Sequence, residues 1–307
     1  MNNRKISIFL LLLFILVLFG FFYLGLNWIF VKPVVVEPQK ISDKNIFTAS
    51  LEINAKEFFS TQSDEKNDTN SINSSSAIST KIVNNEIKIL FEKNKDKKLP
   101  IASLTKLMTA LIVLEKYDLS QKFVINKRAM AEIGEQGNLK EGETLSIKNL
   151  LYIMLIESSN RAAYALSEVM GNDRFVEEMN NKAKLIDLSN TYFIDSTGLD
   201  PNSYSTAKDL VILSRYLFEK YPIFREIMEL KSFSLYINGE FHHKLINSNQ
   251  LLGENRVIGG KTGFTDEARG CFITIQKDNE NQNYFINVIL GAEDRFLEMR
   301  KLINLVN

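Results

Sequence analysis

The stretch Pro100-Ile-Ala-Ser-Leu-Thr-Lys-Leu-Met108 places a serine and a lysine three residues apart where a helical pattern begins. Apolar side chains recur at helical spacing from Leu104 onward, so a helix is predicted over residues 104–116. Positions three apart share one helix face, so the Lys106 ammonium can reach the Ser103 hydroxyl. A serine alcohol needs a neighbouring base to act as a nucleophile, and lysine is such a base once burial or a second cation lowers its pKa. This stretch therefore indicates an activated serine.

A second motif, Ser158-Ser-Asn160, lies in a break between predicted helices, from which short polar side chains can project into a cleft. Ser158 is a candidate relay that moves a proton between the lysine, the nucleophile and a leaving amine. Asn160 is a candidate hydrogen-bonding partner of Lys106 and of a substrate amide. The simpler interpretation of both residues is a helix cap.

The third motif, Lys261-Thr-Gly263, follows Gly259-Gly260 and precedes Phe264. Glycines let another backbone approach closely, so an extended substrate could pair with this strand edge. Lys261 and Thr262 would then hold a terminal carboxylate, and Lys261 would be the second cation beside the first motif. The simpler interpretation is a glycine-rich bulge with a surface lysine.

None of the three patterns is specific alone. Ser-x-x-Lys also occurs at Ser63-Lys66 and Ser205-Lys208, and Ser-x-Asn also occurs at Ser71-Asn73. Ser205 reads as the N-cap of the helix that follows it. The order, spacing and surroundings of the three motifs therefore carry the interpretation.

Composition argues against several other functions. The 307 residues carry 37 Lys and Arg against 37 Asp and Glu, so nothing favours nucleic-acid binding. One cysteine, Cys271, allows no intrachain disulfide. The two histidines, His242 and His243, are adjacent, and neighbours on a strand point to opposite faces, so we expect no shared metal site. A Ser-His-Asp triad has no support in the sequence.

The N-terminus carries a second strong pattern. Residues 1–5 are short and basic, and residues 6–31 form an uncharged run dominated by Leu, Ile and Phe. At about 1.5 Å rise per residue, such a helix can cross a hydrocarbon core of about 30 Å. The run is longer than the apolar region of a secretory signal and lacks a small-residue cleavage site, so we expect an uncleaved transmembrane anchor. Residues 1–5 would form a cytoplasmic tail, which makes the chain a single-pass cell-membrane protein with its catalytic domain extracytoplasmic.

The rest of the chain divides by composition. Residues 32–45 contain two prolines and predict an extended linker, and residues 46–307 form the predicted catalytic domain. Within it, residues 60–80 are mostly Ser, Asn, Asp and Thr, which indicates a disordered insertion because little apolar surface can be buried.

The remaining patterns predict strands near both ends of the domain and helices between them. Strands are expected at 82–83 and 87–91, joined by an Asn-Asn turn, and at 271–276 and 284–290. Helices are expected at 147–157, 160–170, 175–185, 206–221 and 295–306. This order implies an α+β fold, in which a sheet is assembled from distant segments and packs against helices.

The motifs and their surroundings resemble the serine D-alanyl-D-alanine carboxypeptidases, the low-molecular-mass penicillin-binding proteins of the β-lactamase/DD-peptidase superfamily. The similarity is nearly continuous from about residue 82 to the C-terminus. Its blocks are Leu99–Thr109, Gly142–Tyr152 running into the second motif, Phe193–Asp200 with Ser205–Ala207, Asn247–Leu252 and Gly260–Thr265.

The resemblance implies an α/β fold, β-lactamase/DD-peptidase-like, with an antiparallel sheet flanked by helices and a mostly helical subdomain. It implies four catalytic residues, which are Ser103, Lys106, Ser158 and Asn160. It also implies four substrate-binding residues, which are Lys261, Thr262, Gly263 and Phe264. The backbone N–H groups of Ser103 and Phe264 would form the oxyanion hole.

The same resemblance implies a hydrolase of peptidoglycan metabolism and cell-wall organisation. Its substrate would be a peptidoglycan stem peptide ending in D-Ala-D-Ala, which loses its last D-Ala through an acyl-enzyme on Ser103. β-Lactams would acylate the same serine. Neither a metal nor an organic cofactor is implied.

Three features depart from the family pattern. Arg161 follows the second motif where relatives usually carry an acidic or amide residue. Ser248 stands before the Asn-x-Leu-Leu segment, where some relatives use an arginine for the substrate carboxylate. Carboxylate binding would then fall to the Lys261 motif alone, or with Arg256 or Arg269. The chain also ends soon after its last helix, so the N-terminal helix would replace the C-terminal anchor of many relatives.

The sequence bears on three alternative functions. A DD-endopeptidase that cuts peptidoglycan crosslinks would use the same residues and stays open. A class A β-lactamase needs a further glutamate in a Glu-x-x-Leu-Asn context, and none occurs between Asn160 and Lys261. A catalytically silent wall-binding protein is disfavoured because every catalytic residue is present.

Overall fold

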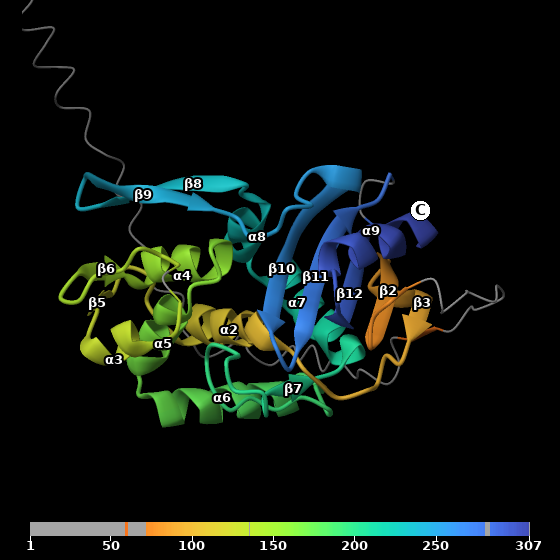
Figure 1. Ribbon diagram of the computed structural model, residues 1–307, viewed down its shortest axis with the longest axis horizontal. Coiled ribbons are helices and arrows are strands. Elements are labelled where there is room, and N and C mark those ends of the chain that lie inside the picture. The colour runs from red at the N-terminus through yellow and green to blue at the C-terminus, as the bar shows by residue number, and fades with distance from the viewer. Residues whose placement is uncertain (1–58, 61–71, 135, 280–282, 307) are drawn as a thin grey trace, which may run out of the picture. The chain divides into compact units, whose positions relative to one another are not determined.

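The computed structural model describes residues 59–60, 72–134, 136–279 and 283–306, all within one compact unit (Figure 1). Its strands are β1 (Phe59–Ser60), β2 (Ser76–Val83), β3 (Glu86–Lys93), β4 (Leu99–Pro100), β5 (Lys122–Val124), β6 (Thr144–Ser146), β7 (Tyr204–Ser205), β8 (Ser232–Ile237), β9 (Glu240–Ile246), β10 (Val257–Thr265), β11 (Arg269–Lys277) and β12 (Tyr284–Ala292). Its α-helices are α2 (Lys106–Lys116), α3 (Lys127–Ala131), α4 (Ile147–Ile156), α5 (Asn160–Glu168), α6 (Asn172–Leu185), α7 (Ala207–Lys220), α8 (Pro222–Glu229) and α9 (Arg295–Val306). Two short 3-10 helices are η2 (Ala102–Thr105) and η3 (Glu254–Arg256).

The main sheet has six strands in the order β1-β3-β2-β12-β11-β10. The pairs from β3 to β10 are antiparallel as predicted, whereas the two-residue β1 pairs with β3 in parallel. Asn84 and Asn85 join β2 to β3 with φ angles of 50° and 67°, the left-handed pair that a tight hairpin turn requires. Because β12 lies beside β2, the sheet is assembled from distant segments, which confirms the sequence-based expectation.

Helices cover both faces of this sheet (Figure 1). The core that contains α7 includes Ile78 and Val288, and the core that contains α9 includes Ala77 and Ile289. Successive residues of a strand point to opposite faces, so the two neighbours on each strand enter different cores. A fully buried Ile side chain contributes about 1.5–3 kcal/mol, so the two cores together hold the sheet between its helices.

The insertion predicted at 60–80 is wrong for its last residues, because β2 begins at Ser76 and Ile72 is already fully buried. The polar side chains that suggested disorder are paired inside the sheet. Ser79 Oγ donates to Asn287 Oδ1 at 2.6 Å, and Thr80 Oγ1 donates to the Ile286 carbonyl at 3.0 Å. Buried hydroxyls are tolerated when they are hydrogen-bonded, which composition alone does not reveal. Residues 61–71 lie outside the described residues.

The helical subdomain is built around α2, whose residues 106–113 are all buried and which packs against α4, α5, α6 and α7. The predicted helices are present, with small shifts at their ends. Ser146 caps α4 as predicted, since its side chain accepts the N–H of Asn149. The cap of α7 is Thr206 and not Ser205, because Thr206 accepts the N–H of Asp209.

The hairpin β8–β9 corrects the expectation that His242 and His243 point apart. Across the strand pair Leu235 faces His243 while Tyr236 faces Phe241, so His242 is an extra residue in a bulge. A bulge interrupts the alternation of side chains along a strand. The two rings therefore meet, with their Nδ1 atoms 2.5 Å apart.

Among the described residues, no helix is long and apolar enough to cross a membrane. The tail predicted at 1–5, the anchor at 6–31 and the linker at 32–45 all lie outside the described residues.

Candidate active site

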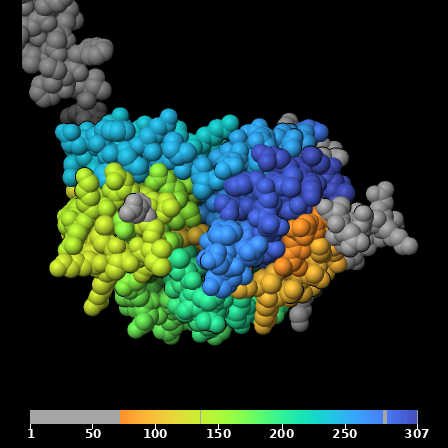
Figure 2. Space-filling view, in the orientation of Figure 1, coloured from red at the N-terminus to blue at the C-terminus, as the bar shows by residue number. Residues whose placement is uncertain are grey.

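The three motifs come together where the sheet meets the helical subdomain. Ser103 lies in η2 directly before α2, Ser158 lies in the turn between α4 and α5, and Lys261 lies on the edge strand β10. Strand β10 packs against η2. In Figure 2 the blue C-terminal strands border the yellow-green helical part of the surface.

Lys106 makes three hydrogen bonds that define its role. Its Nζ lies 2.9 Å from Ser103 Oγ, 2.6 Å from Asn160 Oδ1 and 2.6 Å from the Thr197 carbonyl oxygen. The last two atoms are carbonyl oxygens, which only accept hydrogen bonds. In the neutral amine, two N–H bonds are directed to those carbonyls and the lone pair is left for the Ser103 hydroxyl. This geometry is the one that a base for Ser103 requires.

Burial adjusts the acidity of Lys106. The side chain is fully buried, and desolvation lowers its pKa from 10.5 to about 7, while the negative charges of Asp195 and Glu132 partly oppose this shift. An ordinary lysine stays charged at neutral pH, whereas this one is substantially neutral there. The low pKa that the mechanism requires therefore comes mainly from desolvation.

Lys261 serves the second serine. Its Nζ donates to Ser158 Oγ at 2.7 Å and to the Thr262 carbonyl at 2.9 Å. Burial lowers the pKa of Lys261 well below its ordinary value, and the positive charges of Lys106 and Arg295 lower it further. Ser158 has a φ of 63°, a left-handed conformation that costs a non-glycine residue roughly 1–2 kcal/mol. Such strain is concentrated at functional sites, and here the turn brings a hydroxyl to Lys261.

Asn160 is oriented from both ends of its amide. Oδ1 accepts from Lys106, and Nδ2 donates to the Ile133 carbonyl at 2.7 Å. One N–H of Nδ2 remains for a substrate carbonyl. The cap of α5 is Ser159, so the helix-cap interpretation of Ser158 is wrong.

Glycines allow the close backbone contacts around the nucleophile. A Cβ on Gly263 would lie 3.1 Å from the Ser103 nitrogen, so β10 passes directly beside the Ser103 backbone. Ala102 has a φ of 47°, and a Cβ on Gly198 would lie 1.9 Å from the Ala102 carbonyl oxygen. No larger residue fits at Gly198 without moving this backbone. The backbone of Ser103 therefore lies directly beside β10, the strand that carries Phe264, the other predicted source of an oxyanion donor.

The sequence alone indicated no role for the loop of residues 195–200, whose Thr197 carbonyl contacts Lys106. The Asp195 carboxylate accepts the backbone N–H groups of Thr197 and Asp200, each at 2.7 Å, and that of Gly198. These bonds fix the loop that presents the Thr197 carbonyl to Lys106. The signal was present in the sequence as the Phe193–Asp200 block, whose Asp-x-Thr-Gly pattern is typical of a side-chain-stabilised turn.

The sequence alone also indicated no role for Arg295 at this site. It is the first residue of α9, its Nη1 donates to the Gly263 carbonyl at 3.4 Å, and its Nε is buried with no hydrogen-bond partner among the described residues. A buried guanidinium N–H without a partner favours an incoming acceptor. No local motif marks Arg295, because the fold alone brings α9 to β10.

The two arginines proposed from the sequence lie elsewhere. Arg256 immediately precedes β10, and Arg269 begins β11 opposite Thr265, so they occupy opposite ends of this strand pair. Ser248, which stands in the position of the family arginine, hydrogen-bonds Thr262 with their hydroxyl oxygens 2.8 Å apart. The hydroxyls of Ser248 and Thr262 therefore meet at the position predicted for the carboxylate, and Arg295 contacts the next residue of the motif, Gly263.

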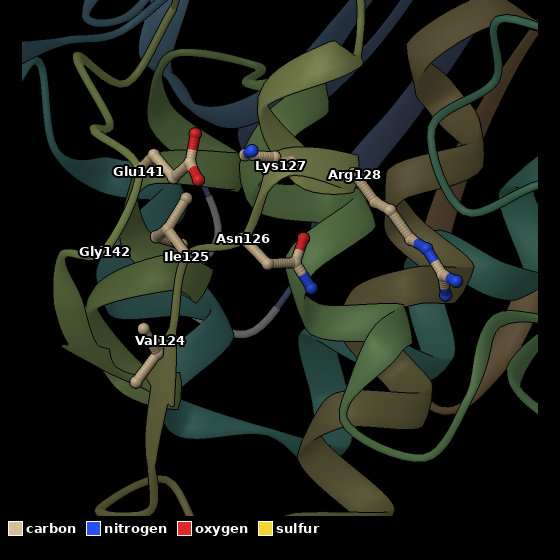
Figure 3. A pocket seen from close by; sticks show the side chains of 7 residues that line it. All are labelled: Val124, Ile125, Asn126, Lys127, Arg128, Glu141 and Gly142. Carbon is tan, nitrogen blue, oxygen red and sulfur yellow. The ribbon is translucent and has the colours of Figure 1, made fainter.

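Other cavities lie outside the three motifs. One of about 480 Å³ is lined by residues 124–128 with Glu141 and Gly142, and Figure 3 shows these side chains around the start of α3. Another of about 300 Å³ borders the second motif and is lined by Gln136, Gly137, Asn138, Glu157, His243 and Ile246. Within the described ranges, no group of three or more His, Cys, Asp or Glu side chains is arranged to hold a metal ion.

Comparison with known sequences gives a consistent result. The D-alanyl-D-alanine carboxypeptidase family profile matches residues 61–294. The D-alanyl-D-alanine carboxypeptidase DacF of Bacillus subtilis is 32% identical over 229 residues, 71% of this chain and 58% of that protein. A D-alanyl-D-alanine endopeptidase of Pseudomonas aeruginosa is 32% identical over 196 residues, 61% of this chain and 62% of that protein. The chain thus spans about three fifths of the length of these curated relatives.

Solved structures share the fold. Penicillin-binding protein D2 of Listeria monocytogenes, in its cefotaxime-bound form, is 32% identical with a TM-score of 0.66 over 76% of this chain and 96% of that one. A D-alanyl-D-alanine carboxypeptidase of Mycobacterium tuberculosis is 24% identical with a TM-score of 0.69, over 76% of this chain and 90% of that one. The expected α/β architecture, an antiparallel sheet with flanking helices, is therefore confirmed.

Proposed function

Because the chain belongs to the D-alanyl-D-alanine carboxypeptidase family, we propose that it is a serine DD-carboxypeptidase of peptidoglycan stem peptides. The observation that carries this proposal is the 2.9 Å contact between Lys106 Nζ and Ser103 Oγ, made by a lysine whose pKa is about 7. The substrate is a stem peptide ending in D-Ala-D-Ala, and the product is the same peptide without its last D-Ala.

In the proposed acylation, Ser103 Oγ attacks the carbonyl carbon of the penultimate D-Ala and Lys106 Nζ takes the hydroxyl proton. Ser158 passes a proton to the leaving amine as the C–N bond breaks, and Lys261 supports Ser158 by its hydrogen bond. The oxyanion that forms is stabilised by the N–H groups of Ser103 and Phe264, each typically worth about 10²–10³ in rate. Water then attacks the ester on Ser103, and hydrolysis frees the enzyme.

Recognition of the terminal carboxylate falls to Lys261, Thr262 and Arg295. Thr262 carries a hydroxyl that pairs with Ser248, and Arg295 carries the unpartnered N–H described above. β-Lactams combine a carboxylate with a reactive amide, so we infer that they acylate Ser103 in the same orientation. The ligand-bound state of the Listeria relative supports this inference.

One experiment tests the proposal most directly. The purified full chain is incubated with a fluorescent penicillin and, separately, with a pentapeptide ending in D-Ala-D-Ala. We expect stable covalent labelling and release of free D-Ala. Failure of the wild type to take label would defeat the acyl-serine mechanism, and rapid penicillin turnover would indicate a β-lactamase.

The endopeptidase alternative is favoured by a specific observation, the relatives of that name at 31–34% identity. It uses the same acyl-enzyme but a larger leaving group. Labelling by penicillin without D-Ala release, together with cleavage of crosslinked dimers, would support the endopeptidase over the carboxypeptidase.

Replacing Arg295 with Gln should raise the KM for the pentapeptide by about 10–100-fold and change kcat less, because the guanidinium binds a carboxylate present in both ground and transition states. The measurement is D-Ala release against substrate concentration. Arg300→Gln is the control, since Arg300 lies on the same helix but pairs with Glu254. Equal KM values for Arg295→Gln and the wild type would show that the carboxylate binds elsewhere.

Replacing Asp195 with Asn should move the acidic limb of the acylation rate to lower pH. The Asp195 charge raises the pKa of Lys106, so its removal lowers that pKa and keeps the amine neutral in more acidic solution. The measurement is penicillin acylation from about pH 5 to 9, with Asp200→Asn as the control in the same loop. An unmoved limb would remove Asp195 from the electrostatics of Lys106.

We also propose that residues 6–31 anchor the protein in the cell membrane with the catalytic domain outside. The uncharged run and the basic residues before it support this placement. Protease added to intact cells should remove the catalytic domain and spare the N-terminal tail. Loss of an epitope at residues 1–5 with the domain intact would reverse the orientation.

A further inference from the structure

Four titratable side chains form a row between the hairpin β8–β9 and the helical subdomain. Glu143 Oε1 lies 2.8 Å from His242 Nε2, and the two histidines meet through Nδ1 atoms 2.5 Å apart. His243 Nε2 then lies 3.1 Å from Glu157 Oε2. Lys140 is a further charged group that acts on His242. The row ends one residue before Ser158.

Glu157 connects the second motif to the segment that leads into the third. Its Oε1 accepts the Ile246 N–H at 3.3 Å, and the carbonyl of the preceding Ile156 accepts the Ser248 N–H at 3.0 Å. Ser248 in turn hydrogen-bonds Thr262. Two adjacent hydrogen bonds therefore tie the residues before Ser158 to the residues before β10.

We propose that Glu157 is a positioning residue, held by His243 and Ile246, which keeps the left-handed turn at Ser158 within hydrogen-bond reach of Lys261. A strained turn persists only when its surroundings fix it. On its far side, Ser159 Oγ donates to the Gln136 carbonyl at 2.6 Å. On its near side, the Glu157 carboxylate provides the corresponding attachment. This inference rests on the proposed function of Ser158 and adds a residue to it.

A hydrogen bond between the two histidines supports this attachment. When two Nδ1 atoms share a hydrogen bond, one donates and the other accepts, so one ring must leave its Nδ1 unprotonated. Burial lowers the pKa of His242, Glu143 opposes this shift, and the charges of His243 and Lys140 reinforce it. The lowered pKa favours a neutral His242, which can share this hydrogen bond and hold His243 beside Glu157.

The first test measures acylation of the full chain by fluorescent penicillin. Glu157→Ala removes both attachments and should lower the acylation rate constant by at least about tenfold, with little change in the dissociation constant of the initial complex. Glu157→Gln keeps an acceptor for Ile246 and should fall between Glu157→Ala and the wild type. Glu226→Gln is the matched control. Glu226 lies on α8 and accepts a hydrogen bond at 2.6 Å from Tyr152 of α4, the helix that Glu157 caps, away from the turn. Its acylation rate constant should stay within about twofold of the wild type.

The second test uses His242→Gln, which removes the ring that contacts His243 and leaves Glu157 unchanged. If the row holds Glu157 in place, the acylation rate constant of His242→Gln should fall between those of the wild type and Glu157→Ala, again with little change in the dissociation constant of the initial complex.

The outcomes separate this inference from the proposed function. A wild type that takes no label overturns the proposed function, and this inference with it. A labelled wild type with unchanged acylation in Glu157→Ala overturns only the role of Glu157. If Glu157→Ala does not fold, Glu157→Gln and His242→Gln decide: acylation rate constants equal to that of the wild type in both variants contradict the proposal.

Discussion

Ser103→Ala should abolish covalent labelling by penicillin and lower D-Ala release by at least about 10⁴-fold. The substitution removes the oxygen that attacks the carbonyl, and no other hydroxyl lies on Lys106 Nζ among its described contacts. The measurements are gel fluorescence after penicillin treatment and D-Ala release from a pentapeptide.

The chain provides its own control for this prediction. Ser205 belongs to a second Ser-x-x-Lys pattern, but its hydroxyl pairs with Thr191 and lies away from Lys106. Ser205→Ala should therefore label like the wild type. If labelling survives in Ser103→Ala but disappears in Ser205→Ala, the nucleophile is Ser205 and not Ser103.

Lys106→Arg should lower acylation by about 10²–10⁴-fold and remove its dependence on pH near 7. Arginine does not release its proton in proteins, so no lone pair remains to accept the Ser103 hydroxyl proton. In the wild type, burial sets the Lys106 pKa at about 7, so the rate should rise as pH increases through 7 and then level off. A retained acidic limb in Lys106→Arg would assign that limb to another group.

The burial that makes Lys106 a base near pH 7 also lowers the folding stability of the protein at that pH. The pKa of Lys106 is about 7 in the folded protein and about 10.4 in an unfolded chain, so the unfolded state binds more protons between these values. Folding stability should therefore rise with pH across this window, by roughly 4–5 kcal/mol for this residue. Lys106→Met removes the charge and should be inactive yet more resistant to thermal unfolding at pH 7. An inactive Lys106→Met with a lower melting temperature would contradict this explanation.

The sequence correctly predicted the features that depend on residues close together in the chain. The Asn84-Asn85 turn, the Ser146 cap and the helix after Ser103 depend on neighbouring residues, and all are present. The three motifs were predicted to converge because their chemistry is interdependent, and the distances from Lys106 to Ser103 and Asn160 are those of direct contact.

The remaining features depend on tertiary contacts that no local pattern encodes. Ser79 reads as a loop residue until Asn287, on a strand from the far end of the chain, provides its partner. His242 and His243 meet because the pairing of β8 with β9 contains a bulge. Arg295 reaches Gly263 because α9 lies on the sheet, far along the chain from the third motif.

The strand order also governs when the main sheet can be completed during synthesis of the chain. β12 is the last of the described strands, yet it joins the early hairpin β2–β3 to β11 and β10. Contacts between residues so far apart in the chain form slowly, because a long loop must close first. A nascent chain that ends before Tyr284 would carry all three motifs, but no strand would join β10 and β11 to β2 and β3, so the six-stranded sheet must await β12.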